Sequence, residues 1–155
     1  MFLAAVLALA VDQATKIGVV FGLDLVNRLR LDVVPPLLSF RYGENRGINF
    51  GLFDGDSDAS RWSLVAISVV ICGAVFLWAR RSHGHSTVMQ VSAGLVIGGA
   101  LGNVADRLLY GYVLDFLNMS CCGLNNPYVF NLADVFIFGG AAGLILFEGR
   151  VKKPA

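Results

Sequence analysis

Two aspartates in apolar surroundings are the side chains of this sequence that could do chemistry together. Asp115 stands within residues 111–116, with no basic residue adjacent to it, and Asp134 begins a long apolar run. Two carboxyl groups that share a site of low dielectric cannot both ionise, so they hold one proton between them over a wide pH range. One of them can then act as a base toward water while the other acts as an acid.

Asp134 also has a simpler explanation. Asn131 precedes it by three residues, and this spacing resembles a helix capping box. Asp134 would then lie in the first helical turn, where the positive end of the helix dipole stabilises a carboxylate. A cap needs no partner from elsewhere in the chain, so the spacing leaves both interpretations open. If the two acids do form a pair, the helix start makes Asp134 the more acidic member.

Further polar residues interrupt apolar runs. Asp12 and Lys16 are four residues apart with the acid first, which predicts an ion pair within one helix. This pair either neutralises itself inside the protein or contacts a ligand. Asn103, Asp106 and Arg107 share one helical face. A structural asparagine and an Asp106–Arg107 pair that anchors the helix end would explain these three residues without a catalytic role.

The composition indicates a membrane protein. The chain has 155 residues, 56% of them hydrophobic and only 15% charged, and its mean hydropathy is +0.69. This length predicts a single domain, residues 1–155. Twelve basic residues against eleven acidic ones leave a net charge of +1, which gives no basic surface for a nucleic acid.

Four apolar runs lie at about residues 2–25, 62–78, 88–104 and 129–147. A helix needs about 20 mostly apolar residues to cross a bilayer, so we expect four transmembrane helices and an all-α fold. Alternation with period two, which a membrane barrel requires, is absent from these runs. The sequence Ala8-Leu9-Ala10 resembles a signal-peptide cleavage site. However, no basic residue precedes it and the apolar run continues, so an uncleaved helix is the better interpretation.

Basic residues next to the spans predict the orientation. Arg80 and Arg81 end the second run, and Arg150, Lys152 and Lys153 follow the fourth, so both termini should face the cytoplasm. The long segment 26–61 would then lie outside. Within it, residues 38–42 and 48–52 alternate as strands do, and residues 43–47 supply a turn. We therefore expect a small hairpin at the membrane surface, followed by a polar connector over residues 54–60.

Other chemistries lack their residues. His83 and His85 are too few for a metal site and lie in a cytoplasmic turn, far from the two aspartates. No serine stands in a Gly-x-Ser-x-Gly elbow. Cys72 lies in an apolar run, and Cys121 and Cys122 are adjacent, so the three cysteines build no disulfide framework. We therefore expect neither a metal nor a cofactor.

As a set, these residues resemble the bacterial lipoprotein signal peptidases, or signal peptidases II. Residues 12–16 are similar to the first motif of that family, and Asn45, Arg46 and Gly47 with Phe50 to the second. Residues 98–116 resemble the third motif and residues 130–134 the last. The four motifs occur in the right order and cover essentially the whole chain.

The resemblance implies an intramembrane aspartyl endopeptidase with four transmembrane helices, a small periplasmic β-sheet and a short surface helix. Its substrate would be a diacylglyceryl-modified prolipoprotein, cut just before the lipidated cysteine. The enzyme would lie in the bacterial inner membrane, in contact with lipid, with its active site near the periplasmic face. It would need no metal, no cofactor and no obligate protein partner.

The resemblance also assigns roles to individual residues. Asp115 and Asp134 match the catalytic pair. Supporting or substrate-binding positions match Asn45, Asn103, Asp106, Arg107 and Asn131, while Asp12 matches a structural position. The chain departs from the family at Ile48 and Asn49, where small residues are common, and in the longer stretch 118–128. That stretch is expected to form an added lip over the site.

Two other functions use the same features. Membrane carboxylates also serve as proton relays, as in a small proton-coupled carrier or channel subunit. A relay should place ionisable groups through the whole membrane depth, whereas most of those found here gather near one face. A non-catalytic assembly factor, in turn, predicts that Asp115 and Asp134 can be replaced freely.

Overall fold

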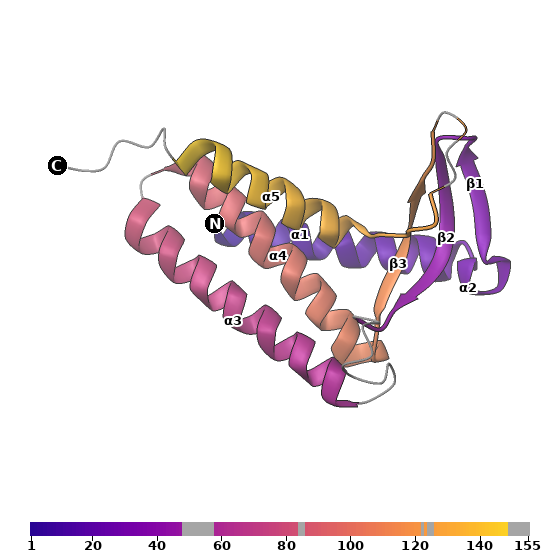
Figure 1. Ribbon diagram of the computed structural model, residues 1–155, viewed down its shortest axis with the longest axis horizontal. Helices are drawn as coiled ribbons and strands as arrows, with labels where there is room; N and C mark the ends of the chain where they lie inside the picture. The colour runs from indigo at the N-terminus through magenta and orange to yellow at the C-terminus, as the bar shows by residue number, and fades with distance from the viewer. Residues whose placement is uncertain (48–57, 84–85, 122, 124–125, 149–155) are drawn as a thin grey trace.

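Helices packed side by side carry a small β-sheet at one end (Figure 1). The computed structural model describes residues 1–47, 58–83, 86–121, 123 and 126–148. In chain order the elements are α1 (Phe2–Lys16), the π-helical η1 (Ile17–Gly22), α2 (Leu25–Arg28), β1 (Arg30–Val34), β2 (Leu38–Asn45), α3 (Asp58–His83), α4 (Thr87–Tyr110), β3 (Val113–Met119) and α5 (Leu132–Glu148).

Three helices in the described part of the chain are long and apolar enough to cross a membrane: Phe2–Gly22, Asp58–Arg81 and Thr87–Tyr110. Helix α5 is also apolar and has 17 residues. Large apolar side chains cover the outer faces of the helices, since Val70 is 69% exposed and Phe138 is 77% exposed. Apolar surface of this extent is typical of contact with lipid or a partner rather than with water.

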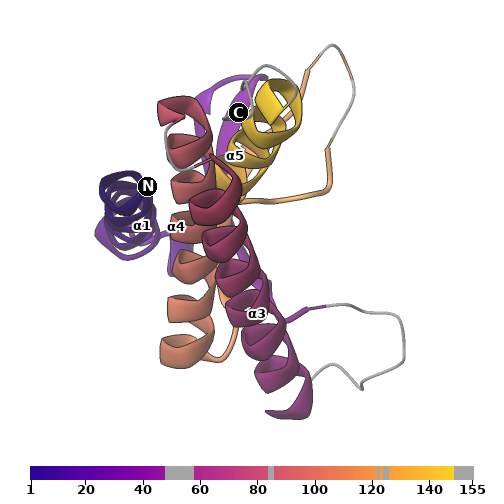
Figure 2. The ribbon, with the colours of Figure 1, turned by 90° about the vertical axis from the view of Figure 1, so that its left-hand side faces the viewer.

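Helix α4 is the centre of the helical part. Figure 2 shows α1 on one side of it and α5 on the other. Glycine permits both close approaches. A Cβ on Gly98 would overlap the carbonyl oxygen of Ala5, and a Cβ on Gly99 would lie 2.5 Å from the carbonyl oxygen of Ala133. The glycines of α4 therefore allow both neighbouring helices to pack closely against it.

The sheet has the order β1-β2-β3, and both pairings are antiparallel. The predicted strand at 38–42 is confirmed as part of β2. The predicted turn at 43–47 is wrong for its first three residues, because residues 43–45 continue the strand and pair with β3. The other predicted strand, 48–52, lies outside the described residues, as do residues 54–57 of the predicted connector. Residues 58–60 form the first turn of α3.

Strand β3 is covered on both faces. Val113, Leu114, Asp115 and Phe116 are all buried, and Leu114 and Phe116 pack with Val20 and Leu25. Burial on both faces removes the alternation of apolar and polar residues by which a strand is recognised. The pairing of β3 with β2 places Asp115 on an edge strand of the sheet, opposite Gly43.

Candidate active site

Asn131 caps helix α5, as its spacing from Asp134 predicts. The backbone N–H of Asp134 donates to Asn131 Oδ1 at 3.0 Å, and the backbone N–H of Asn131 donates to Asp134 Oδ2 at 3.3 Å. These reciprocal bonds form a capping box. They leave Asp134 Oδ1 available for a further partner, so the cap does not exclude a second role for this carboxylate.

Asp115 lies next to this helix start. Asp115 is 4% exposed, and Asn131 Nδ2 donates to Asp115 Oδ1 at 2.6 Å. Asn131 itself is fully buried. A single asparagine therefore contacts both aspartates, one through its side-chain amide and the other through the cap.

A second asparagine completes the connection. Asn103 Nδ2 donates to Asp134 Oδ1 at 3.0 Å, and Asn131 Nδ2 donates to Asn103 Oδ1 at 3.2 Å. The hydrogen bonds thus run from Asp115 through Asn131 and Asn103 to Asp134. They join strand β3 to helices α4 and α5.

The pKa of Asp115 is raised from 3.8 to about 7. Burial is the main cause, because it disfavours the charged form, and the nearby charge of Asp134 adds to it. Hydrogen bonds from Asn131 and Asn45 and the charge of Lys16 act in the opposite direction. Asp115 therefore exchanges its proton near neutral pH, and its pKa depends on the charge of Asp134.

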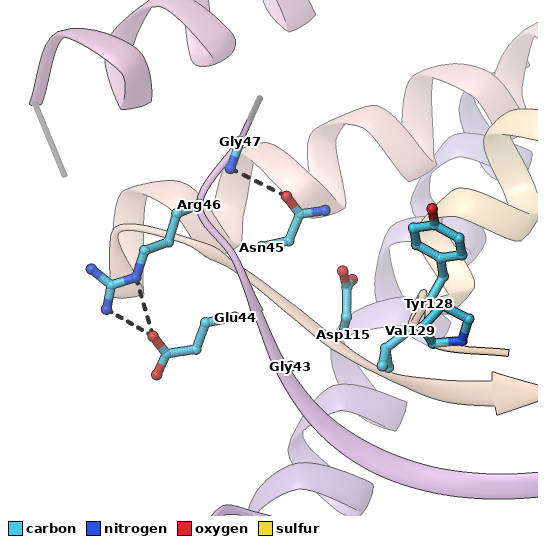
Figure 3. A pocket seen from close by; sticks show the side chains of 9 residues that line it. Gly43, Glu44, Asn45, Arg46, Gly47, Asp115, Tyr128 and Val129 are labelled. Carbon is cyan, nitrogen blue, oxygen red and sulfur yellow. Dashed lines mark hydrogen bonds and ion pairs between the residues drawn. The ribbon is translucent and has the colours of Figure 1, made fainter. Parts of the chain in front are cut away.

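Asp115 also borders an open pocket of about 540 Å³. Figure 3 shows Asn45 on one side of the Asp115 carboxyl and Tyr128 on the other. Residues 43–47 form one wall, and Pro127, Tyr128 and Val129 form another. Asn45 thus lies where a cleft residue is expected, and part of the stretch 118–128 lines the same pocket. The motif residue Phe50 and the departures Ile48 and Asn49 lie outside the described residues.

The pocket wall at the end of β2 is held by charged and aromatic groups. Arg46 Nη2 lies 2.7 Å from Glu44 Oε2, and its guanidinium carbon lies 5.4 Å from the centre of the Tyr112 ring. The hydroxyl groups of Tyr42 and Tyr112 are 3.2 Å apart. These contacts fix the exposed end of the strand beside Asp115.

The remaining polar residues form a buried group behind the aspartates. Lys16 Nζ lies 2.8 Å from Asp12 Oδ2, so the predicted ion pair is confirmed. Asp106 pairs with Lys16 rather than in the alternative Asp106–Arg107 pair, because its Oδ2 lies 2.7 Å from Lys16 Nζ. Close packing of α1 on α4 causes the difference: a Cβ on Gly102 would lie 2.6 Å from Asp12 Oδ2.

Two residues of this region have contacts that spacing alone did not reveal. Arg107 Nη1 donates to the carbonyl oxygen of Asn103 at 3.2 Å. Gln13, which follows Asp12 in the first motif, donates from Nε2 to Asp106 Oδ1 at 2.8 Å and to Asp12 Oδ2 at 3.2 Å. Its position inside that motif was the only sequence signal for this role.

The histidines and cysteines are the candidates for other chemistry. Among the residues that the structure describes, no group of three or more His, Cys, Asp or Glu could hold a metal. His85 and Cys122 lie outside the described residues. Cys121 is disulfide-bonded, and Cys72 is a free buried thiol of α3.

Known proteins are similar to this chain in sequence. The family model "Signal peptidase (SPase) II" matches residues 4–148. A lipoprotein signal peptidase of Methylobacterium radiotolerans is 44% identical over 144 residues, which cover 93% of this chain and 82% of that protein. One of Methylorubrum extorquens is 41% identical over 153 residues, which cover 99% of this chain and 87% of that protein.

Solved structures show the same fold. A bacterial membrane enzyme determined at 1.9 Å resolution by the in meso method has a TM-score of 0.80 and 26% sequence identity, over 97% of this chain and 92% of that one. Another, at 2.3 Å resolution, has a TM-score of 0.76 and 26% identity, over 99% of this chain and 92% of that one. Together with the family model, these relatives show that the chain belongs to the signal peptidase II family of proteases.

Proposed function

We propose that this chain is an aspartyl endopeptidase of the bacterial inner membrane. It removes the signal peptide from diacylglyceryl-modified prolipoproteins and cleaves just before the lipidated cysteine. The observation that carries this proposal is the hydrogen-bonded connection from Asp115 through Asn131 and Asn103 to Asp134, beside an open pocket.

The two carboxyl groups divide the acid and base roles. Asp115 holds the proton, since its pKa is raised to about 7. Asp134 lies in the first turn of α5, at the positive end of the helix dipole, and its Oδ2 accepts the backbone N–H of Asn131. Asp134 accepts a proton from water, and the water oxygen attacks the peptide carbonyl. Asp115 donates its proton to the carbonyl oxygen, which gives a gem-diol.

The pair then completes the cleavage. The carbon–nitrogen bond breaks as the proton held by Asp134 passes to the leaving amine, and Asp115 recovers a proton from the gem-diol. Asn103 and Asn131 hold the two carboxyl groups in position by hydrogen bonds. Asn45 lines the cleft that receives the substrate backbone. Arg107 donates a hydrogen bond to the carbonyl oxygen of Asn103 and orients the substrate. Asp106 supports the site through its buried ion pair with Lys16.

The substrate's lipid determines where this site must lie. Acyl chains stay in the bilayer, so the scissile bond of a lipid-modified precursor lies near the membrane interface. We propose that α5 is a fourth span in a single membrane domain of residues 1–155. The sheet lies at the end of the helices opposite the N-terminus (Figure 1), and Arg80 and Arg81 lie at the end of α3 away from the sheet. By the positive-inside rule, both termini then face the cytoplasm and the pocket faces the periplasm.

Cleavage by the purified chain tests the proposal. We expect the wild-type protein in detergent to cut a diacylglyceryl-modified precursor before its cysteine. Asp115→Asn and Asp134→Asn should each lower kcat by at least about 100-fold, because each removes one member of the acid–base pair. Asp32→Asn, an exposed change on β1, serves as the control.

The outcomes separate the candidate functions. Full cleavage by either active-site variant contradicts the acid–base pair of Asp115 and Asp134. No cleavage by the wild-type chain contradicts the peptidase and leaves the proton-coupled carrier and the non-catalytic assembly factor as candidates.

A further inference from the structure

A buried charge group, here called the Lys16 cluster, consists of Asp12, Lys16 and Asp106. All three side chains are at most 1% exposed, and Lys16 Nζ lies within 2.8 Å of both carboxylates. Two acids and one base leave this cluster with a net negative charge. Buried ion pairs add little net stability compared with apolar residues of similar volume. Mutual neutralisation would also need only one of the two acids.

The carboxylates of the cluster have a second set of partners. Asp12 Oδ1 accepts the backbone N–H of Ala133 at 2.9 Å, and Asp106 Oδ2 accepts the backbone N–H of Leu114 at 3.0 Å. Ala133 immediately precedes Asp134, and Leu114 immediately precedes Asp115. Each carboxylate of the cluster therefore holds the peptide N–H just before one proposed catalytic acid.

Lys16 makes a third connection. Its Nζ donates to Asn103 Oδ1 at 3.2 Å. With its oxygen facing Lys16, the Asn103 amide presents Nδ2 to Asp134, at 3.0 Å. The ammonium group thus holds the two carboxylates that fix the backbone, and it also orients the amide that binds Asp134.

We propose that Lys16 is a positioning residue for the aspartyl chemistry, and that through Asp12, Asp106 and Asn103 it sets the alignment of Asp115 with Asp134. This inference rests on the proposed function. A displacement of about 1 Å at a reacting group can lower the rate by about 100-fold. The loss of Lys16 should therefore be seen in kcat, while the pocket that binds substrate stays in place.

The test compares Lys16→Met with Lys16→Arg in the full chain in detergent. We expect Lys16→Met to lower kcat on a diacylglyceryl-modified precursor by about 10- to 100-fold with KM changed less than about threefold. Lys16→Arg, which keeps the charge, should recover part of the loss. Arg30→Met is the control, because Arg30 is an exposed base that pairs only with exposed Asp32 in the described part of the chain.

The pH profile provides a readout that general destabilisation does not move. In the described part of the chain, charged groups that act on Asp115 come from three helices: Lys16 of α1, Arg107 of α4 and Asp134 of α5. Because the charge of Lys16 lowers the pKa of Asp115, Lys16→Met should shift the alkaline limb of kcat/KM to higher pH. Wild-type kcat together with an unmoved limb in Lys16→Met overturns the inference.

A second pair of variants covers the case in which Lys16→Met does not fold. Asp12→Asn keeps an oxygen that can accept the Ala133 N–H, whereas Asp12→Ala does not. We expect Asp12→Asn to retain at least about tenfold more kcat than Asp12→Ala, by the same alignment reasoning. Equal kcat values in the two variants overturn the inference. If the wild-type chain itself does not cleave, the proposed function fails and this inference fails with it.

Discussion

Replacing Asp115 by asparagine should stabilise the protein at neutral and alkaline pH while it removes activity. Burial and the charge of Asp134 raise the pKa of Asp115 from 3.8 to about 7 in the folded chain. The folded state then holds this proton more tightly than the unfolded state does. The resulting stability is fully present below about pH 4 and is lost as the pH rises to about 7.

The size of the effect follows from the rise in pKa. A change of one pKa unit is worth about 1.4 kcal/mol, so the rise corresponds to at most about 4 kcal/mol. Asparagine has nearly the same shape and does not ionise. We therefore expect Asp115→Asn to gain stability over the wild type progressively between pH 4 and pH 7, and to keep a constant advantage above that range.

Unfolding in detergent, followed from pH 4 to pH 9, measures this difference. The matched control is Asp32→Asn, whose carboxylate lies on the exposed face of β1 and should change stability by no more than about 0.5 kcal/mol. Parallel pH curves for the wild type and Asp115→Asn would refute the reasoning, because they would mean that Asp115 is no more difficult to ionise when folded.

Three further changes test the helix cap, the helix packing and the pocket wall. Asn131→Ser keeps a capping oxygen, whereas Asn131→Ala loses it. The alanine variant should therefore be about 1 kcal/mol less stable than the serine variant when unfolded in detergent. Equal stabilities of the two variants would contradict the cap. Gly98→Val places a branched side chain against the carbonyl of Ala5 and should destabilise the protein by about 3 kcal/mol, measured in the same way. Wild-type stability of that variant would contradict the close contact of α1 with α4. Asn118→Ala removes two 2.8 Å bonds to carbonyls of segment 126–129, each worth about 1 kcal/mol. It should raise KM for the lipid-modified precursor, and an unchanged KM would mean that this segment does not contact substrate.

Local patterns predicted the features that depend on neighbouring residues. The apolar runs located the helices, since a span of about 20 apolar residues needs no information from elsewhere in the chain. The spacing of Asn131 and Asp134 predicted the cap. The spacing of Asp12 and Lys16 predicted their ion pair, because both residues lie on one face of α1.

Long-range contacts escaped prediction. Residues 43–45 of β2 pair with β3, which lies about 70 residues later in the chain. Because β3 is buried on both faces, it lacks the alternation of apolar and polar residues by which a strand is recognised. The spacing of Asp106 and Arg107 did not reveal the partner of Asp106, because Lys16 comes from another helix. That contact depends on how closely α1 approaches α4, which glycine packing decides and sequence spacing does not.

The most direct test of the paired carboxyls is a titration of Asp115 in the wild type and in Asp134→Asn, followed by NMR of the labelled carboxyl carbon in detergent. We expect a pKa of about 7 in the wild type. In the variant it should be lower but still above 3.8, because burial remains while the neighbouring charge is gone. An identical pKa in the two proteins would contradict a shared site for these two acids.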